Sequence, residues 1–287
     1  MSLKVDTMIL IADSGSTKAD WAWVASDGTT TYVHTKGYNP VVHPRELFHQ
    51  EMEKLSTELL PDISPAEVHY YGAGCWDLKR KKVIQERIEQ TWPEAKVLVM
   101  HDLLGAARAA CGHHAGVACI LGTGSNTCFY DGEDVTDNVT NLGFMLGDEG
   151  SGSHLGKALL RAYFYRELDD ELNDKFEQFA AVDKSMILDK VYESDIPNTY
   201  LASFTRFMGE HQQHPLMQKI IFNSFAEFLD RHVRKYRGHL EVPVSFIGSI
   251  AFHFKDILLA AMHERDLHVG RFVHKPIEAL ADFHRGK

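Results

Sequence analysis

The chain has 287 residues, of which 44% are apolar and 24% charged, and its formal net charge at neutral pH is −10. This length suits two modest domains or one large one. The acidic charge, with scattered lysines and arginines, argues against nucleic acid or an anionic membrane as a partner, but not against a nucleotide bound through backbone amides and a metal. The four cysteines lack C-x-x-C spacing, and there is no basic-then-apolar leader or long apolar run. These features predict a cytoplasmic protein without disulfides.

The first distinctive segment is an apolar run over residues 9–12 that ends at Asp13 and is followed by Ser14-Gly15-Ser16-Thr17-Lys18. Apolar residues resume over 19–24, which predicts two strands joined by a tight turn. Such a turn exposes backbone N–H groups and hydroxyls beside a carboxylate, and can hold a phosphate and its metal ion. It is not a P-loop, because no G-x-x-x-x-G-K-[ST] pattern occurs. From these residues alone, an ordinary Gly-rich hairpin is an equal alternative.

The next segments predict a strand over 31–36, a helix from Pro44, a strand over 68–71, a helix through 83–92 and a strand over 96–100. The first hundred residues therefore have the order β-β-β-α-β-α-β. Asp102 follows the last strand and begins a helix over 103–111. It is either a plain N-cap, worth about 1 kcal/mol, or a carboxylate at the carboxyl end of a strand, where open α/β sheets bind ligands.

The pattern restarts at Gly116. An apolar strand over 117–121, the turn Gly122-Thr123-Gly124-Ser125-Asn126 and a returning strand over 127–130 repeat the opening motif roughly 110 residues later. This repetition indicates a duplicated α/β unit.

A glycine-dense, acidic segment follows over 147–153 and opens a helix that Ser151 or Ser153 would cap, which favours a binding role. Residues 154–238 are predicted to be mostly helical, with the longest helix running from Leu216 to about Arg237. A strand over 244–247 then runs into Gly248-Ser249 and a helix, a third junction of the kind that can face a nucleotide. A strand over 267–273 and a helix over 277–283 close the chain.

Four segments together resemble those of the actin/hexokinase/Hsp70 ATPases, namely residues 13–18, His101-Asp102, Gly122 to Asn126 and Ile247-Gly248-Ser249. They match, in order, a phosphate hairpin, a catalytic carboxylate, a second phosphate hairpin and an adenosine loop. With residues 147–152 added, nearly the whole chain resembles the BadF/BadG/BcrA/BcrD ATPase family and, within it, the N-acetylglucosamine kinases.

This resemblance implies an α/β fold, namely a two-domain actin-like ATPase (ribonuclease H-like) fold with a nucleotide cleft between the domains. The N-terminal phosphate-1/sugar domain would span 1–104, and the terminal helix 276–287 can pack back on it. The C-terminal phosphate-2/adenosine domain would span 105–275.

The resemblance also implies ATP and Mg²⁺ as cofactors and assigns a role to each matching residue. Asp102 matches the catalytic base, and Asp13 matches the residue that holds Mg²⁺ through water. The phosphate- and ATP-binding positions are Gly15, Ser16, Thr17, Lys18, Gly122, Thr123, Gly124, Gly248 and Ser249. The sugar-binding positions are Asn39, Ser125, Asn126 and Asp148. For Lys18, a surface pair with Asp20 is an equal alternative.

The implied activity is ATP-dependent phosphorylation of an N-acetylated hexosamine, with O6 of N-acetylglucosamine favoured and a homodimer as a compatible assembly. Two departures from the family pattern leave the choice among sugars open. Residue 142 is leucine where some animal relatives carry tryptophan, and the loop over 72–76 is not Ser-rich. N-acetylmuramic acid, N-acetylmannosamine and glucose are the other candidates. Two rival functions are an ATPase activator of a 2-hydroxyacyl-CoA dehydratase or benzoyl-CoA reductase, and a non-catalytic sugar-sensing module.

Overall fold

The computed structural model describes residues 8–194 and 196–286, and the chain divides into two compact units. The first unit comprises Met1–His113 and Lys275–Lys287, and the second comprises His114–His274. The predicted boundary after residue 104 differs from this division, because helix α3 (Asp102–Cys111) stays whole in the first unit. The outermost residues of the predicted first domain, 1–7 and 287, lie outside the described residues.

The first unit is built on a five-stranded sheet with the order β3-β2-β1-β4-β5. Its strands are β1 (Ile9–Ser14), β2 (Lys18–Val24), β3 (Thr30–Lys36), β4 (Glu67–Gly72) and β5 (Lys96–His101). The first three strands run antiparallel, whereas β1, β4 and β5 run parallel. The predicted order of strands and helices in this part of the chain is confirmed.

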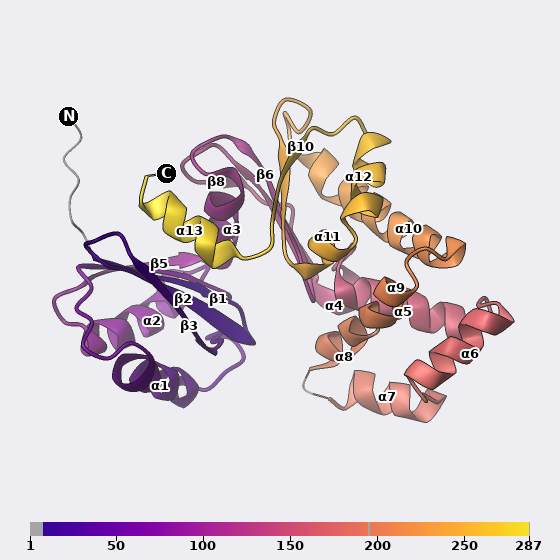
Figure 1. The fold of residues 1–287 in the computed structure, drawn as a ribbon, viewed down its shortest axis with the longest axis horizontal. Coiled ribbons are helices and arrows are strands. Elements are labelled where there is room, and N and C mark those ends of the chain that lie inside the picture. The colour runs from indigo at the N-terminus through magenta and orange to yellow at the C-terminus, as the bar shows by residue number, and fades with distance from the viewer. Residues whose placement is uncertain (1–7, 195, 287) are drawn as a thin grey trace. The chain divides into compact units, whose positions relative to one another are not determined.

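Helices cover both faces of this sheet (Figure 1). They are α1 (Arg45–Lys54), which continues as a π-helical turn over Leu55–Leu59, α2 (Leu78–Thr91), α3 and α13 (Pro276–His284). Alternate strand residues such as Leu10 and Tyr70 pack against α1 and α2 in one core cluster. Tyr71 points to the other face, where Gly105 of α3 lies against its ring and His284 of α13 lies 2.9 Å from its hydroxyl. This alternation follows from the two-residue period of a strand.

The second unit repeats the same topology, with the sheet order β10-β9-β6-β7-β8. Its strands are β6 (Gly116–Leu121), β7 (Ser125–Tyr130), β8 (Val135–Asp137), β9 (Val244–Ile247) and β10 (Val269–Val273). Strands β6, β7 and β8 are antiparallel neighbours, and β6, β9 and β10 are parallel. The sheet inferred from the repeated strand–turn–strand motif is therefore present.

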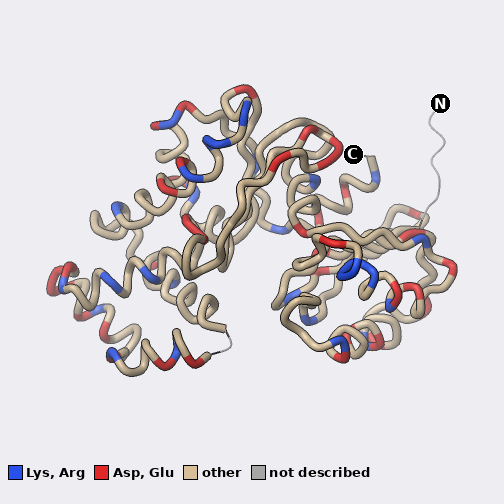
Figure 2. Tube along the Cα trace, turned by 180° about the vertical axis from the view of Figure 1, so that it is seen from behind, with Lys and Arg blue, Asp and Glu red and all other residues tan. Residues whose placement is uncertain are grey.

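Helices make up most of the rest of the second unit. They are α4 (Gly143–Leu146), α5 (Gly152–Phe164), α6 (Asp170–Phe179), α7 (Lys184–Tyr192), α8 (Pro197–Ser203), α9 (Thr205–Glu210), α10 (Pro215–Arg231), α11 (Ser249–His253) and α12 (Lys255–His263). The core joins one face of the sheet to α5, α10 and α12 through residues such as Leu121, Leu155, Phe228 and Leu258. Among the described residues, no helix has the length and apolar character needed to cross a membrane. Figure 2 shows lysines and arginines interspersed with acidic residues along both units.

The predicted long helix from Leu216 to about Arg237 is too long at its C-terminal end. Helix α10 stops at Arg231, and a short 3₁₀ turn (Val233–Lys235) follows. Tyr236 is buried, and its hydroxyl lies 2.6 Å from Thr127 Oγ1 and accepts the Val139 N–H at 3.0 Å. A helical path would carry the Tyr236 side chain away from these partners, so tertiary contacts end the helix.

Gly156 and Gly209 offer a matched test of helix packing in the second unit. A Cβ on Gly156 would lie 1.9 Å from the carbonyl oxygen of Leu201, whereas a Cβ on Gly209 would meet no atom within 4 Å. We expect Gly156→Ala to destabilise the protein by about 2 kcal/mol or more through forced separation of α5 and α8. Gly209→Ala should leave stability unchanged or raise it by about 0.5–1 kcal/mol. Urea denaturation of both variants checks this; equal midpoints would contradict it.

Candidate active site

Three segments of the first unit leave its sheet at one edge. The register pairs Ser14 of β1 with Gly72 of β4, and Gly72 with His101 of β5. The turn after β1, the loop after β4 and helix α3 after β5 therefore start side by side. The Ala73 N–H donates to the Ser14 carbonyl at 2.8 Å and ties two of these segments together. The carboxyl ends of parallel strands are where open α/β sheets bind ligands.

The first predicted phosphate turn is a three-residue connection between β1 and β2. The Gly15 N–H donates to the Lys18 carbonyl at 3.0 Å and closes it. Ser16 and Thr17 are exposed, and within the described part of the chain their backbone N–H groups donate to no protein acceptor. Successive free amides in a turn can hold an anion. This turn, which comprises Gly15, Ser16, Thr17 and Lys18, thus has a geometry suited to holding an anion.

Gly37 supports this turn, and sequence reasoning missed it. Its N–H donates to the Thr17 carbonyl at 3.0 Å, and a Cβ at its position would lie 2.1 Å from the carbonyl oxygen of Gly15. Any side chain there would displace the turn. Within the segment over 37–40, sequence reasoning assigned only Asn39 to the site.

Asn39, a predicted sugar ligand, lies beside the first turn. Its Nδ2 donates to Ser16 Oγ at 3.0 Å, and its Oδ1 accepts the Val41 N–H at 3.0 Å. Gly74 adopts a φ of 75°, and a Cβ on it would lie 2.2 Å from Asn39 Oδ1. The structure therefore brings Asn39 between the first turn and the loop that follows β4.

Lys18 makes the surface pair that was one of its two predicted roles. Its Nζ lies 2.7 Å from Asp20 Oδ1, with side-chain exposures of 60% and 34%. A pair this exposed contributes little to stability. A contact between Lys18 and phosphate stays a prediction.

Asp102 is the first residue of α3, and the alternative that made it the N-cap is wrong. His101 is the cap, since its Nδ1 accepts the Leu104 N–H at 3.1 Å. Asp102 Oδ1 accepts the Leu103 N–H at 2.9 Å. Burial raises the pKa of Asp102 to about 6, although these backbone hydrogen bonds act to lower it. A carboxyl with this pKa is ionised at neutral pH and can take up a proton readily.

Asp13 shares the electrostatic environment of Asp102. Burial, together with the negative charges of Asp102 and Asp20, raises the pKa of Asp13 to about 7, and the positive charge of Lys18 opposes this rise. A divalent cation would relieve this repulsion. The described residues contain no group of three histidine, cysteine, aspartate or glutamate side chains that could hold a metal together. The donors therefore fit Mg²⁺ held through its waters, as that ion prefers, rather than a closed protein cage.

The second predicted phosphate turn joins β6 to β7 and is anchored to helix α5. The Gly122 N–H donates to the Gly124 carbonyl at 3.0 Å. The N–H groups of Gly152 and Ser153, at the start of α5, donate to the carbonyls of Gly122 and Thr123 at 2.8 and 3.0 Å. The second turn is therefore held in place by hydrogen bonds from a separate segment of the chain.

Asp148, a predicted sugar ligand, contacts the same turn. Its Oδ1 accepts the Ser125 N–H at 3.1 Å and Asn141 Nδ2 at 2.9 Å. A Cβ on Gly124 would lie 3.0 Å from Asp148 Oδ2, so the carboxylate packs directly against the turn. Asn141 also donates to the Ser125 carbonyl. Sequence reasoning assigned Asn141 no role, since a single asparagine before Leu142 gives no signal of a hydrogen-bond partner so distant in the sequence.

The structure does not bring Asn126 into this contact. Its Oδ1 accepts the Thr127 N–H at 2.9 Å and Asn138 Nδ2 at 3.2 Å. Because neighbouring residues of a strand point to opposite faces, Ser125 and Asn126 diverge. Asn126 is held by Asn138 instead of by Asp148.

The predicted adenosine-loop residues lie at the base of the second turn. Gly248 has a φ of 110°, and a Cβ on it would lie 2.4 Å from the carbonyl oxygen of Leu121 and 3.3 Å from the Gly122 nitrogen. Only glycine adopts this conformation readily and allows this approach. Ser249 begins the five-residue helix α11.

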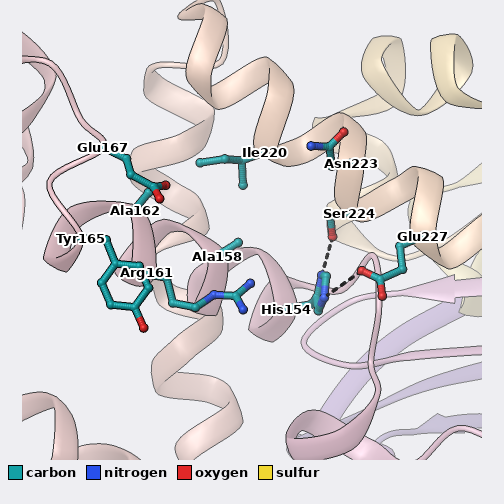
Figure 3. Close-up of a pocket in the computed structure, with 10 residues that line it drawn as sticks. All are labelled: His154, Ala158, Arg161, Ala162, Tyr165, Glu167, Ile220, Asn223, Ser224 and Glu227. Carbon is teal, nitrogen blue, oxygen red and sulfur yellow. Dashed lines mark hydrogen bonds and ion pairs between the residues drawn. The ribbon is translucent and has the colours of Figure 1, made fainter.

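Figure 3 shows a separate polar cluster at a cavity of about 360 Å³ beside α5 and α10. His154 Nδ1 lies 2.7 Å from Ser224 Oγ, and His154 Nε2 lies 3.7 Å from Glu227 Oε2. Serine, histidine and a carboxylate could form a hydrolytic triad. However, Ser224 lies in the interior of α10 and is only 3% exposed, which does not suit a nucleophile. This cluster is structural, and no predicted site residue lines the cavity.

Comparison with known proteins identifies related structures, although no protein-family model matches the chain. The structure matches a putative N-acetylglucosamine kinase from Porphyromonas gingivalis with 37% sequence identity and a TM-score of 0.89, over 98% of this chain and 99% of that one. It also matches one from Chromobacterium violaceum with 16% identity and a TM-score of 0.74, over 96% and 98% of the two chains. The MamK filament protein matches over 97% of each chain, with 11% identity and a TM-score of 0.57.

The matches at 16% and 11% identity show the fold alone, and they confirm the predicted α/β two-domain actin-like architecture. The match at 37% identity extends over almost the full length of both chains and shows a closer relationship. The chain belongs to the family of N-acetylglucosamine kinase-like proteins with the actin-like fold.

Proposed function

We propose that this protein transfers the γ-phosphoryl group of ATP to O6 of N-acetylglucosamine. The observation that carries the proposal is the 37% identity, over 98% of the chain, to the Porphyromonas gingivalis protein that is named a putative N-acetylglucosamine kinase. The position of Asp102 at a strand end supports a phosphotransfer reaction. We further propose that the chain lies within the BadF/BadG/BcrA/BcrD ATPase family, acts in the cytoplasm and takes a small amino sugar as its partner. A homodimer is the assembly compatible with that family.

Asp102 acts as the general base in this proposal. Its carboxylate accepts the proton of the sugar hydroxyl while the hydroxyl oxygen forms a bond to the γ-phosphorus. The bond from that phosphorus to the β,γ-bridging oxygen breaks, and ADP leaves. A pKa of about 6 suits the role, because the group is ionised at neutral pH and still basic enough to accept a proton.

The two turns supply positioning, which phosphoryl transfer needs more than covalent chemistry. We assign the free amides of Ser16 and Thr17, with Gly15 and Lys18, to the β- and γ-phosphates. We assign the second turn to phosphate as well, through its backbone N–H groups. The residues assigned to the second turn and the adenosine are Gly122, Thr123, Gly124, Gly248 and Ser249.

The sugar and the metal use the remaining predicted residues. Asn39, Ser125, Asn126 and Asp148 are assigned to the sugar, and Asn39 would exchange its hydrogen bond to Ser16 for one to a sugar hydroxyl. Asp13 would hold Mg²⁺ through water. When bound, Mg²⁺ neutralises charge on the phosphate oxygens.

The rival function as a dehydratase or reductase activator requires an iron–sulfur cluster. In the register of β6 and β7, Cys119 lies opposite Thr127 and Cys128 lies opposite Ala118. Residues opposite each other share a face and neighbours along a strand do not, so the two thiols point to opposite faces of the sheet. Both are fully buried. Two sulfurs placed this way cannot ligate one cluster, which favours the kinase over the activator.

Replacement of Asp102 by Asn tests the proposed base. We expect Asp102→Asn to lower kcat by about 10²- to 10⁴-fold, because the amide keeps the shape but cannot accept a proton. Sugar and ATP binding measured by calorimetry should stay within about threefold of wild type. A variant with wild-type turnover would remove Asp102 from the mechanism.

The raised pKa values predict the pH dependence. With saturating Mg²⁺, kcat/KM for the sugar should fall about tenfold per pH unit below about pH 6, as Asp102 becomes protonated. With limiting Mg²⁺, protons compete for Asp13, so apparent Mg²⁺ affinity should weaken as the pH falls through about 7. Initial rates at several Mg²⁺ concentrations check both effects. A rate that is constant from about pH 5 to neutrality would exclude a base with this pKa.

A panel of sugars separates the candidate functions. ADP release should depend on N-acetylglucosamine, with N-acetylmuramic acid, N-acetylmannosamine and glucose tested beside it, and NMR should place the new phosphate on O6. Slow ADP release without sugar follows if the loaded site excludes water as a competing acceptor. Equal release with and without sugar would favour the ATPase activator. Sugar binding with no ADP release would favour the sensing module.

A further inference from the structure

Asp148 holds a strained backbone conformation beside the second turn. Its φ is 59°, in the left-handed region that residues other than glycine rarely adopt. Such a conformation is unfavourable for a residue with a side chain and persists only where the surroundings hold it. The Asp148 carboxylate accepts the Ser125 N–H, so the strain lies next to the turn assigned to phosphate.

Glu149, the next residue, anchors the loop to the end of α10. Its side chain is buried, and its Oε2 accepts a hydrogen bond from His232 Nε2 at 3.0 Å. Its Oε1 lies 3.7 Å from Arg231 Nε. Although burial alone would raise it, hydrogen bonds from His232 and the backbone, with the charge of Arg231, hold the pKa of Glu149 below its usual value.

His232 is suited to act as a fixed donor. It is the C-cap residue of α10 and is 6% exposed, and its own N–H donates to the Phe228 carbonyl at 3.0 Å. Its Nδ1 is buried without a hydrogen-bond partner among the described residues. If Nδ1 carries no proton, the imidazole has no buried donor without a partner. The neutral tautomer therefore has its proton on Nε2, which donates it to Glu149.

The residues after Glu149 complete the attachment of the loop. Gly150 has a φ of 74°, and a Cβ on it would lie 2.9 Å from Phe228 Cβ, which seats the loop closely on α10. The Ser151 N–H donates to the Asp148 carbonyl at 3.1 Å, and Ser151 Oγ caps α5 by accepting the His154 N–H at 3.2 Å. The loop is thus joined to α5 and α10, and the Asp148 side chain faces the second turn.

We propose that Glu149 and His232 are positioning residues: their hydrogen bond keeps Asp148 in its left-handed conformation, and Asp148 in turn fixes the second turn through Ser125. Among the described residues, neither side chain forms a hydrogen bond or ion pair with the turn itself. The kinetic consequences rest on the proposed kinase function, whereas the structural consequence does not.

The kinetic test compares removal of the anchor with a matched change nearby. Glu149→Ala should raise KM for both sugar and ATP by at least about tenfold, because Asp148 and the turn lose their fixed places. Glu149→Gln keeps an acceptor for His232 and should stay within about threefold of wild type. The control is Glu227→Gln, which removes the other carboxylate bound by Arg231, 2.8 Å from its Nε, and leaves Glu149 and His232 intact.

A double-mutant cycle checks that the two residues act as one unit. His232→Ala should match Glu149→Ala, and the double variant should lose no more than either single variant, since one hydrogen bond is removed in all three. A purely structural role would instead lower the active fraction with KM unchanged. Additive losses, or an unchanged KM in a folded Glu149→Ala protein, would overturn the proposal.

Hydrogen exchange supplies a readout that needs no substrate. In Glu149→Ala, peptides that contain Ser125 and residues 141–153 should exchange at least about tenfold faster, while α6 keeps its wild-type protection. If Glu149→Ala does not fold, His232→Asn, whose side chain is too short to reach Glu149, carries the same expectation. Unchanged exchange around Ser125 in a folded variant contradicts the proposal even if the protein proves not to be a kinase. Faster exchange in a protein without ADP release would leave the positioning role and remove only the proposed function.

Discussion

The conformations of both turns depend on backbone contacts that are too close for a side chain. Gly37 lies against the carbonyl of Gly15 in the first unit, and Gly248 lies against the carbonyl of Leu121 in the second. Each supporting glycine comes from a segment distant in sequence and presses on the turn from the side. Because the contact is between backbones, it fixes the direction of the turn amides without depending on any rotamer. An anion site made of amides requires this kind of rigidity.

The shared strand topology explains why the two turns arise in equivalent places. In each sheet an antiparallel hairpin is followed by two parallel strands on the other side of its first strand. The parallel pairing brings the chain back to the same edge, so later segments start beside the turn. In the first unit β5 leads into Asp102, and in the second β9 leads into Gly248. Asn39 reaches the same end of the first sheet after β3, which pairs antiparallel with β2. One topological rule therefore collects polar groups from separate parts of each unit.

Acidic side chains serve opposite purposes in the two units because their surroundings differ. Asp13 and Asp102 are partly buried in the same unit, and both have raised pKa values that suit cation binding and proton transfer. Glu149 is also buried, yet His232 and Arg231 keep it ionised as a structural anchor. Burial alone thus does not define a functional carboxylate. The groups around a buried carboxylate determine whether it suits proton transfer and cation binding or serves as a structural anchor.

The sequence by itself determined the order of elements in the first unit, the repeat of the hairpin and the residues of both turns. These features depend on apolar periodicity and turn chemistry, which act over a few neighbouring residues. The tertiary structure decided that His101 and not Asp102 caps α3, and that α10 ends at Arg231. It also decided the pairing of Glu149 with His232, which are 83 residues apart. Such contacts leave no local pattern, since the two partners meet only after the sheet and its helices have packed.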